Sequence, residues 1–249
     1  MAEGSAQDIA RTDYYQDYWE NPQSEDCAYI RWKAAITGQH PRVKSATSIL
    51  DVGCGSGYML DALRRPGVRL CGVEMAEGAI AHVRKRGFEG AVVDLETESL
   101  PFAAGEFDVV LCYDVLEHLF APGLLLGQLR RVLKPGGIAL LCVPNTLNAF
   151  NRLMFLSGKY VDIMDTSHQS SELFSNHIRL FSKNLFERFV HSGGFRVLKK
   201  NFYFPDRFTD PRYRLPANLT KLVTAPRLHE IFPSLFALGL LYVCAKDDT

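Results

Sequence analysis

Short apolar runs alternate with segments of helical periodicity between residues 48 and 143, and this alternation limits the fold more than any other feature. The runs at 109–112 and 138–143 are almost wholly apolar, which is typical of strands buried on both faces. Strand and helix in regular succession predict a parallel sheet with helices on both sides. Because crossovers between parallel strands are right-handed, the α/β fold should be doubly wound, with ligands at the carboxyl ends of the strands.

The predicted elements follow this alternation along the chain. We expect strands at 48–52, 70–73, 91–93, 107–112, 138–143, 195–204 and 238–245. We expect helices at 58–65, 76–86, 124–133 and 182–192. Residues 1–45 are expected to form an N-terminal helical arm or lid, and residues 46–249 one domain. Insertions at about 145–182 and 205–235 should cover the ligand, and the second, rich in proline, should be irregular.

Composition excludes several classes of protein. Hydrophobic residues make up 47% of the chain and its formal net charge at pH 7 is zero, so neither a disordered chain nor a general nucleic-acid binder is expected. The six cysteines have no spacing typical of metal ligands, and four lie in apolar runs, which predicts a reduced, cytoplasmic protein without a metal. The apolar stretch Leu235–Ala245 is too short to span a membrane.

Three glycines follow the first predicted strand, in the order Asp51-Val52-Gly53-Cys54-Gly55-Ser56-Gly57. Glycines at this spacing let the backbone turn sharply and approach a ligand where a Cβ atom would block it. The helix behind the turn offers unpaired backbone N–H groups. The dinucleotide fingerprint G-x-G-x-x-G/A is completed in neither frame, because Tyr58 and Leu60 stand where its last residue is needed.

The sequence ILDVGCGSG at 49–57 resembles the first motif of class I S-adenosylmethionine-dependent methyltransferases. The segments DVVLCYDVLEHL at 108–119 and LKPGG at 133–137 are further hallmarks of that family. The resemblance implies a Rossmann-like, mostly parallel seven-stranded sheet with an antiparallel last strand. It also implies S-adenosylmethionine as the cofactor, held by the turn residues Asp51, Gly53, Gly55 and Gly57.

The residues at the ends of the next strands take further cofactor contacts under this resemblance. Glu74 ends the second strand, where an acid can accept both ribose hydroxyls. Asp94 follows the third strand and would accept from the adenine amino group, and the Leu95 backbone N–H would face a ring nitrogen. Tyr113 ends the fourth strand and would border the methionine part of the cofactor.

Within this family the chain looks most like the branch acting on small molecules, which includes ubiquinone-biosynthesis O-methyltransferases and sugar-modifying enzymes of polysaccharide clusters. The run Asn176–Ser182 followed by Gly194-Phe195 is typical of the last group. The resemblance thus implies methyl transfer to a hydroxyl on a sugar or another anionic metabolite. It leaves a homodimer open.

Two histidines are candidates for the catalytic base, because an acceptor hydroxyl benefits from a base with a pKa near neutrality. His118 comes just after the fourth strand, at the cofactor end of the sheet, and His177 lies in the insertion that should cover the pocket. The alternative for His118 is a histidine that packs near the cofactor without transferring a proton. For His177 it is a loop residue that shapes the lid.

Candidate substrate residues come from three segments. Tyr18 belongs to an aromatic cluster at 14–19 that could fold over the site or anchor the arm, and Arg179 lies two residues after His177 in the covering insertion. Arg212 and Arg214 lie in the segment 199–227, where seven basic and two acidic residues give a net charge of +5. This segment suits an anionic or carrier-linked acceptor, although a solvated loop has the same composition.

Three other functions compete with this interpretation. A nicotinamide-dependent oxidoreductase shares the fold class, but the glycine spacing disfavours it. A nucleic-acid methyltransferase is disfavoured because the fourth strand ends in Tyr113-Asp114-Val115 rather than a Pro-Pro-Tyr type of motif. A catalytically silent protein that binds the cofactor or a partner stays open, because binding and turnover use different residues.

Overall fold

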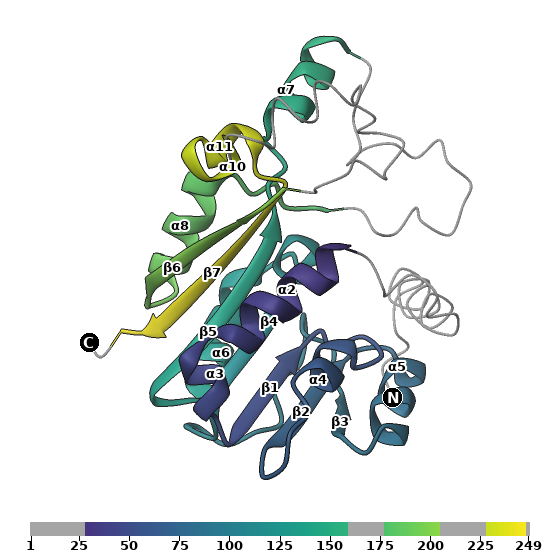
Figure 1. The fold of residues 1–249 in the computed structure, drawn as a ribbon. Coiled ribbons are helices and arrows are strands. Elements are labelled where there is room, and N and C mark those ends of the chain that lie inside the picture. The colour runs from purple at the N-terminus through teal and green to yellow at the C-terminus, as the bar shows by residue number, and fades with distance from the viewer. Residues whose placement is uncertain (1–27, 159–176, 205–227, 248–249) are drawn as a thin grey trace, which may run out of the picture.

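The computed structural model describes residues 28–158, 177–204 and 228–247, which contain a seven-stranded sheet flanked by helices (Figure 1). The strand order is β3-β2-β1-β4-β5-β7-β6. The strands are β1 (Ser48–Val52), β2 (Arg69–Glu74), β3 (Glu89–Val92), β4 (Phe107–Tyr113), β5 (Leu133–Pro144), β6 (Phe195–Tyr203) and β7 (Gly239–Lys246). Only β7 runs antiparallel to its two neighbours. The predicted doubly wound sheet with a reversed last strand is confirmed.

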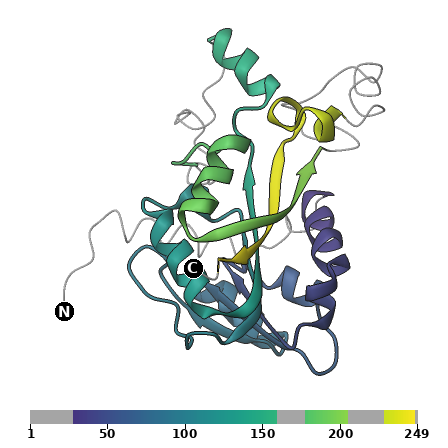
Figure 2. The same cartoon turned by 90° about the vertical axis from the view of Figure 1, so that its left-hand side faces the viewer.

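Helices cover both faces of the sheet, so most strands are buried on both sides. They are α2 (Ala28–Gln39), α3 (Pro41–Ser45), α4 (Tyr58–Ala62), α5 (Glu77–Lys85), α6 (Pro122–Val132), α7 (Ala149–Leu156), α8 (Lys183–Ser192), α10 (Leu228–Ile231) and α11 (Pro233–Phe236). Figure 2 shows α2 on one side of the sheet and α8 on the other. No helix in the described part of the chain is long and apolar enough to cross a membrane.

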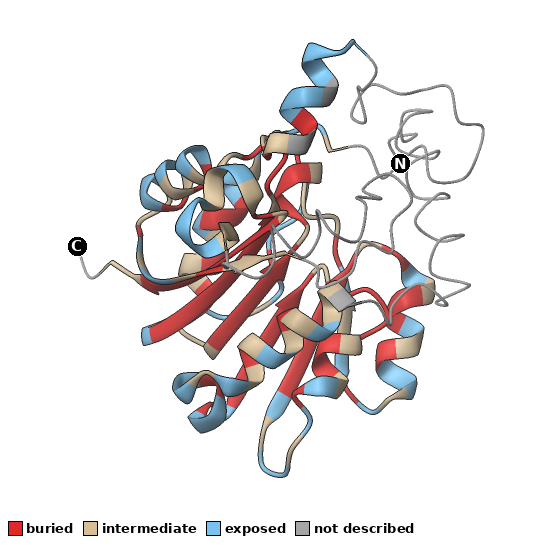
Figure 3. Ribbon diagram, turned by 45° about the horizontal axis from the view of Figure 1, so that its top comes forward, coloured by how far each residue is buried: buried red, intermediate tan, exposed pale blue. Residues whose placement is uncertain are grey.

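Two apolar clusters form the core, one on each face of the sheet. Successive residues of one strand enter different clusters: Leu50 belongs to the cluster that includes residues of α6 and α8, whereas Ile49 belongs to the cluster that includes residues of α4 and α5. All five residues of β1 are buried, as Figure 3 shows for the central strands. The cysteines of the described strands, Cys71, Cys112, Cys142 and Cys244, are free and buried, as their apolar surroundings predict.

The structure contains helices in the two segments that were expected to be insertions without regular structure or with none assigned. Residues 228–236, predicted to be irregular, form α10 and α11, and each N–H at 235–237 bonds a carbonyl three or four residues earlier. Helix α7 begins at a cap, because the Asn148 side chain accepts a hydrogen bond from the Asn151 backbone N–H. The rest of both insertions, 159–176 and 205–227, lies outside the described residues. The domain boundary at residue 45 stays a prediction.

The register of the parallel strands decides where a ligand can bind. β1 pairs with β2 on one side and with β4 on the other, both in parallel. The carboxyl ends of these three strands therefore meet at one edge, and the loops that follow them lie next to one another. The glycine turn follows β1, Glu74 ends β2 and Tyr113 ends β4, so the fold brings the predicted cofactor residues together.

Candidate active site

The glycine turn after β1 has a backbone that other residues rarely adopt. Gly53, Gly55 and Gly57 have φ angles of +72°, +50° and +88°, all in the left-handed region. A Cβ atom on Gly53 would lie 2.2 Å from the Cγ2 atom of Val115, in the segment after β4. Glycine is therefore required here both by backbone angle and by the close approach of two loops at the same edge of the sheet.

Glu74 faces the glycine turn from the end of β2. Its Oε2 atom accepts a hydrogen bond from the Gly55 backbone N–H at 3.2 Å, and its Oε1 atom accepts one from Met75 N–H at 2.7 Å. Burial raises the pKa of this carboxyl, while the backbone hydrogen bonds lower it. Each carboxylate oxygen has a second acceptor position, so the group can still accept from a ligand hydroxyl beside the turn.

Asp51 is the acid two residues before the first glycine, and it is buried within β1. Burial raises the pKa of its carboxyl to about 7, because the positive charge of Lys33 only partly offsets the lost hydration and Glu74 adds a like charge. The strand end thus contains a titratable acid close to the turn.

Asp94 and Leu95 lie in the turn after β3, next to the end of β2. The Asp94 Oδ1 atom accepts from the Glu96 backbone N–H at 3.0 Å, which shapes the turn. The Glu96 carboxylate in turn accepts from the Phe120 backbone N–H at 2.6 Å. This contact ties the predicted adenine end of the site to the segment after β4.

A partly buried ion pair at the end of β4 was not predicted from the sequence. The Lys33 ammonium, on α2, lies 2.5 Å from the Asp114 carboxylate, and the Tyr29 hydroxyl donates to the same carboxylate at 3.1 Å. Asp114 has a φ angle of +55°, a rare conformation for a residue with a side chain. Tyr113, predicted to border the cofactor, shares a hydrogen bond of 2.6 Å with Thr37 of α2. Its contact with a cofactor stays a prediction.

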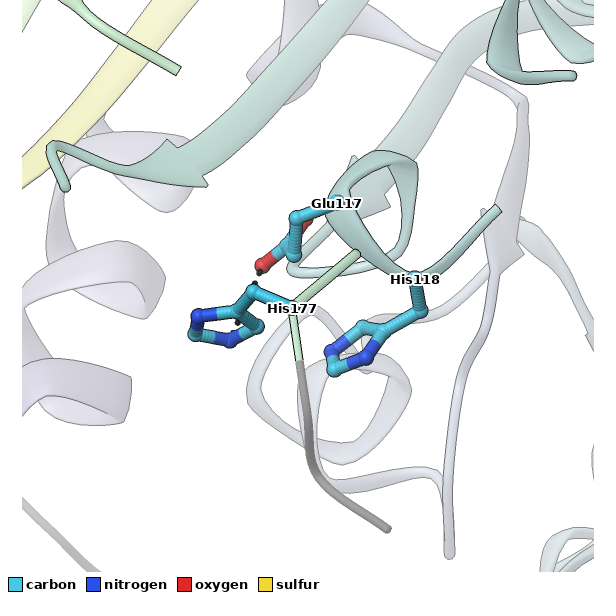
Figure 4. A group of neighbouring side chains, drawn as sticks. All are labelled: Glu117, His118 and His177. Carbon is cyan, nitrogen blue, oxygen red and sulfur yellow. Dashed lines mark ion pairs between the residues drawn. The ribbon is translucent and has the colours of Figure 1, made fainter. Parts of the chain in front are cut away.

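The two predicted catalytic histidines come together beside a third residue, Glu117 (Figure 4). Glu117 and His118 lie on the short 3₁₀ helix η1 (Leu116–His118), and His177 comes from a segment 59 residues further on. The imidazole centroids of His118 and His177 are 5.0 Å apart, and the His177 Nε2 atom is 3.9 Å from the Glu117 Oε1 atom. Burial, followed by the nearby Asp114 charge, raises the pKa of Glu117 well above its usual range.

Arg179 has a structural part in this cluster. Its backbone N–H donates to the Glu117 carbonyl at 3.0 Å, and its guanidinium donates to the carbonyls of Leu119 and Phe120. These bonds fasten the segment of His177 to the loop after β4. A contact of Arg179 with substrate stays a prediction, and Tyr18, Arg212 and Arg214 lie outside the described residues.

The fold and this turn together define a class of protein. A glycine turn in the left-handed region, with the Glu74 carboxylate bonded to its backbone at adjacent carboxyl ends of parallel strands, fits a nucleoside-containing cofactor. A family model described as "Methyltransferase domain" matches residues 50–141. Residues 50–141 are therefore similar to a methyltransferase domain. The class I S-adenosylmethionine-dependent methyltransferases, which the glycine turn resembles, use S-adenosylmethionine as their cofactor.

Curated relatives resemble part of the chain. A ubiquinone biosynthesis O-methyltransferase of Thiobacillus denitrificans is 32% identical over 152 residues, which are 55% of this chain and 62% of that protein. A probable S-adenosylmethionine-dependent methyltransferase of Mycolicibacterium smegmatis is 33% identical over 129 residues, covering 48% of this chain and 50% of that protein. The matches thus span less than two thirds of the length of these relatives.

Solved structures resemble nearly the whole chain. The 1,6-didemethyltoxoflavin-N1-methyltransferase of Burkholderia thailandensis, with S-adenosylhomocysteine bound, has a TM-score of 0.61 at 16% identity and covers all of this chain and 93% of its own. A complex of the Haloferax volcanii Trm112 methyltransferase activator with a methyltransferase also gives 0.61, at 18% identity, covering 94% of this chain and 97% of that one. At such identities the similarity shows the fold.

Proposed function

We propose that this protein transfers the methyl group of S-adenosylmethionine to a hydroxyl of a small molecule. The observation that carries the proposal is the left-handed glycine turn after β1 with the Glu74 carboxylate bonded to its backbone. The sulfonium of the cofactor supplies the electrophilic methyl group. The contribution of the chain is to hold the donor and the acceptor in line and to keep water from the reacting atoms.

The donor side of the site is assigned to the residues at the first three strand ends. Gly53, Gly55 and Gly57 leave room for the nucleoside, and Glu74 accepts from the ribose hydroxyls. Asp94 accepts from the adenine amino group, and the Leu95 N–H faces a ring nitrogen. Asp51 and Tyr113 border the methionine part of the cofactor.

The acceptor side is assigned to the cluster at η1. His118 and His177 assist the loss of the proton from the acceptor hydroxyl, which makes its oxygen a better nucleophile. We assign Arg179, Arg212, Arg214 and Tyr18 to an anionic acceptor such as a carboxylated or phosphorylated sugar, since clustered arginines suit such a group. Residues 1–45 serve as an arm over the site. The buried, free cysteines suit a cytoplasmic location, and a homodimer stays open.

Calorimetry with the cofactor product tests the donor side. S-adenosylhomocysteine should bind one per chain, and Glu74→Gln should weaken binding about 10- to 100-fold, because a hydrogen bond to a charged group contributes about 1.5–3 kcal/mol. Glu77→Gln, at an exposed position three residues later, is the matched control and should bind normally. Absence of heat with both the donor and its product would refute the proposal, and heat with NAD instead would favour an oxidoreductase.

The acceptor is identified by turnover. Purified protein with the methyl donor is offered hydroxylated sugars with and without a carboxylate or phosphate, and the formation of S-adenosylhomocysteine is measured. Turnover should be faster with the sugars that carry a carboxylate or a phosphate. Cofactor binding without turnover on any acceptor would instead indicate the silent cofactor-binding protein.

A further inference from the structure

We propose that Glu117, His118 and His177 bind one divalent cation of the Zn²⁺ type, and that this cation binds the oxygen of the acceptor. The second part rests on the proposed function, whereas binding of the cation does not. The spacing of cysteines and histidines along the chain predicted no metal, because the three residues of this set come together only in the fold, from segments 59 positions apart.

The donor atoms have the right identity and almost the right spacing. One carboxylate oxygen and one nitrogen of each histidine all lie within 4.8 Å of one another. In a tetrahedral zinc site with bonds of about 2.1 Å, ligand atoms lie about 3.4 Å apart. Figure 4 shows the Glu117 carboxylate directed toward His177, with the ring of His118 beside it. Binding of the cation would draw these donor atoms together by rotation of the three side chains.

The burial of Glu117 is the independent observation that points to a ligand. Its side chain is 0% exposed, and neither carboxylate oxygen has a hydrogen-bond partner in the described part of the chain. The His177 Nε2 atom, at 3.9 Å, is beyond hydrogen-bond distance. A buried carboxylate is costly unless it is paired or coordinates a metal, and a cation between the three side chains would satisfy it.

The composition of the set selects the type of cation and leaves room for a substrate. Two imidazoles and one carboxylate suit zinc, and catalytic zinc sites use three protein ligands with an open fourth position. The loop that holds Glu117 and His118 begins at Val115, which contacts the glycine turn, so the open position belongs to the same edge as the cofactor site. Magnesium, which prefers oxygen ligands and several waters, fits less well.

An acceptor hydroxyl in the open position would lose its proton more readily, because a bound cation stabilises the oxyanion. The proton leaves to water. The acceptor oxygen then forms a bond to the methyl carbon while the carbon–sulfur bond breaks, and that electron pair stays on sulfur. The products are the methyl ether, S-adenosylhomocysteine and one proton. In this scheme both histidines assist as ligands of the cation.

The test is calorimetry with zinc chloride, and in parallel manganese chloride, on the full chain after removal of metals with a chelator. Zinc should bind one per chain and more tightly than manganese. Glu117→Gln and His177→Asn should each weaken zinc binding at least tenfold, whereas His191→Asn, a control on the exposed part of α8, should not. His177 lies at the start of a described segment outside the helices and strands, so its variant tests the site even if Glu117→Gln disturbs folding.

The same variants separate this inference from the proposed function. S-adenosylhomocysteine should bind the stripped protein and His177→Asn as it binds the untreated protein, while the chelator should abolish turnover and zinc should restore it. No stoichiometric zinc binding to the stripped protein, or equal binding by both site variants, would overturn the metal site and leave the cofactor site standing. Zinc binding without S-adenosylhomocysteine binding would support the metal site and refute the proposed cofactor site.

Discussion

Replacing Gly53 with alanine should destabilise the protein for two reasons that can be measured apart. The first is backbone strain, because a φ angle of +72° costs a residue with a side chain about 1 kcal/mol. The second is overlap, because the new Cβ atom would lie 2.2 Å from the Val115 Cγ2 atom, and overpacking of this kind costs about 1–3 kcal/mol. Gly53→Ala should therefore lower the free energy of unfolding by about 2–4 kcal/mol.

Gly67 supplies a matched control for the strain. Its φ angle of +76° is almost the same, and a Cβ atom there would meet nothing within 4 Å. Gly67→Ala should cost only the strain, about 1 kcal/mol. The difference between the two variants, measured by urea unfolding followed by circular dichroism, isolates the overlap.

A second substitution removes the overlap itself. In Val115→Ala the methyl groups of Val115 are gone, and the Cβ atom that stays lies 3.6 Å from the Cβ position of Gly53, an ordinary contact. The double variant Gly53→Ala/Val115→Ala should therefore lose about 1–3 kcal/mol less than the sum of the single variants. The reasoning is refuted if Gly53→Ala costs no more than Gly67→Ala, or if the double variant is simply additive.

Three further substitutions test the charges around the site by urea unfolding. Burial raises the pKa of Asp51 to about 7 in the folded protein. The wild type should therefore lose stability as the pH rises from 4 to 7, by up to about 1.4 kcal/mol per pH unit. Asp51→Asn should remove this dependence on pH. Burial alone would raise the pKa of Asp108, but its hydrogen bonds lower the pKa below the usual value. The wild type should therefore lose stability as the pH falls below 4, and this loss should be smaller in Asp108→Asn. An equal loss of stability in the variant would contradict this reasoning. Lys33→Met removes the ammonium group that pairs with the partly buried Asp114 carboxylate, and it should lower the free energy of unfolding by about 2 kcal/mol. The control Lys44→Met, at an exposed position, should change this free energy very little. Equal effects of the two variants would show that the ion pair does not stabilise the protein.

The elements that sequence patterns predicted are those whose signals are local. The apolar runs of β4 and β5 and the glycine spacing after β1 each lie within a dozen residues, and the structure places all three where the patterns indicated. The beginning of β5 is different: the predicted strand starts at 138, whereas in the structure β5 starts at Leu133 and includes the LKPGG segment.

The residues that the sequence analysis missed depend on contacts between distant segments. Nothing in the sequence around Lys33 distinguishes it from the other basic residues of the N-terminal region, and only the packing of α2 against the sheet brings it to Asp114. Glu117 stands in the hallmark segment, but its complete burial depends on η1 and on the segment that carries Arg179. Gly53 was predicted, but its close approach to Val115 was not, because it joins residues 62 positions apart.

This difference explains why the sequence indicates the methyl donor more clearly than the acceptor. The predicted donor residues from Asp51 to Leu95 lie on successive strand ends within 45 positions, so the order of the sheet itself brings them together. The proposed acceptor cluster comes from η1 and the segment at 177–179, which meet through backbone hydrogen bonds between loops rather than through the order of the strands. Loops at the strand ends can vary in sequence more readily than the strands that they connect. The acceptor can therefore vary among proteins that share this donor site, and its chemistry has to be read from the cluster at Glu117.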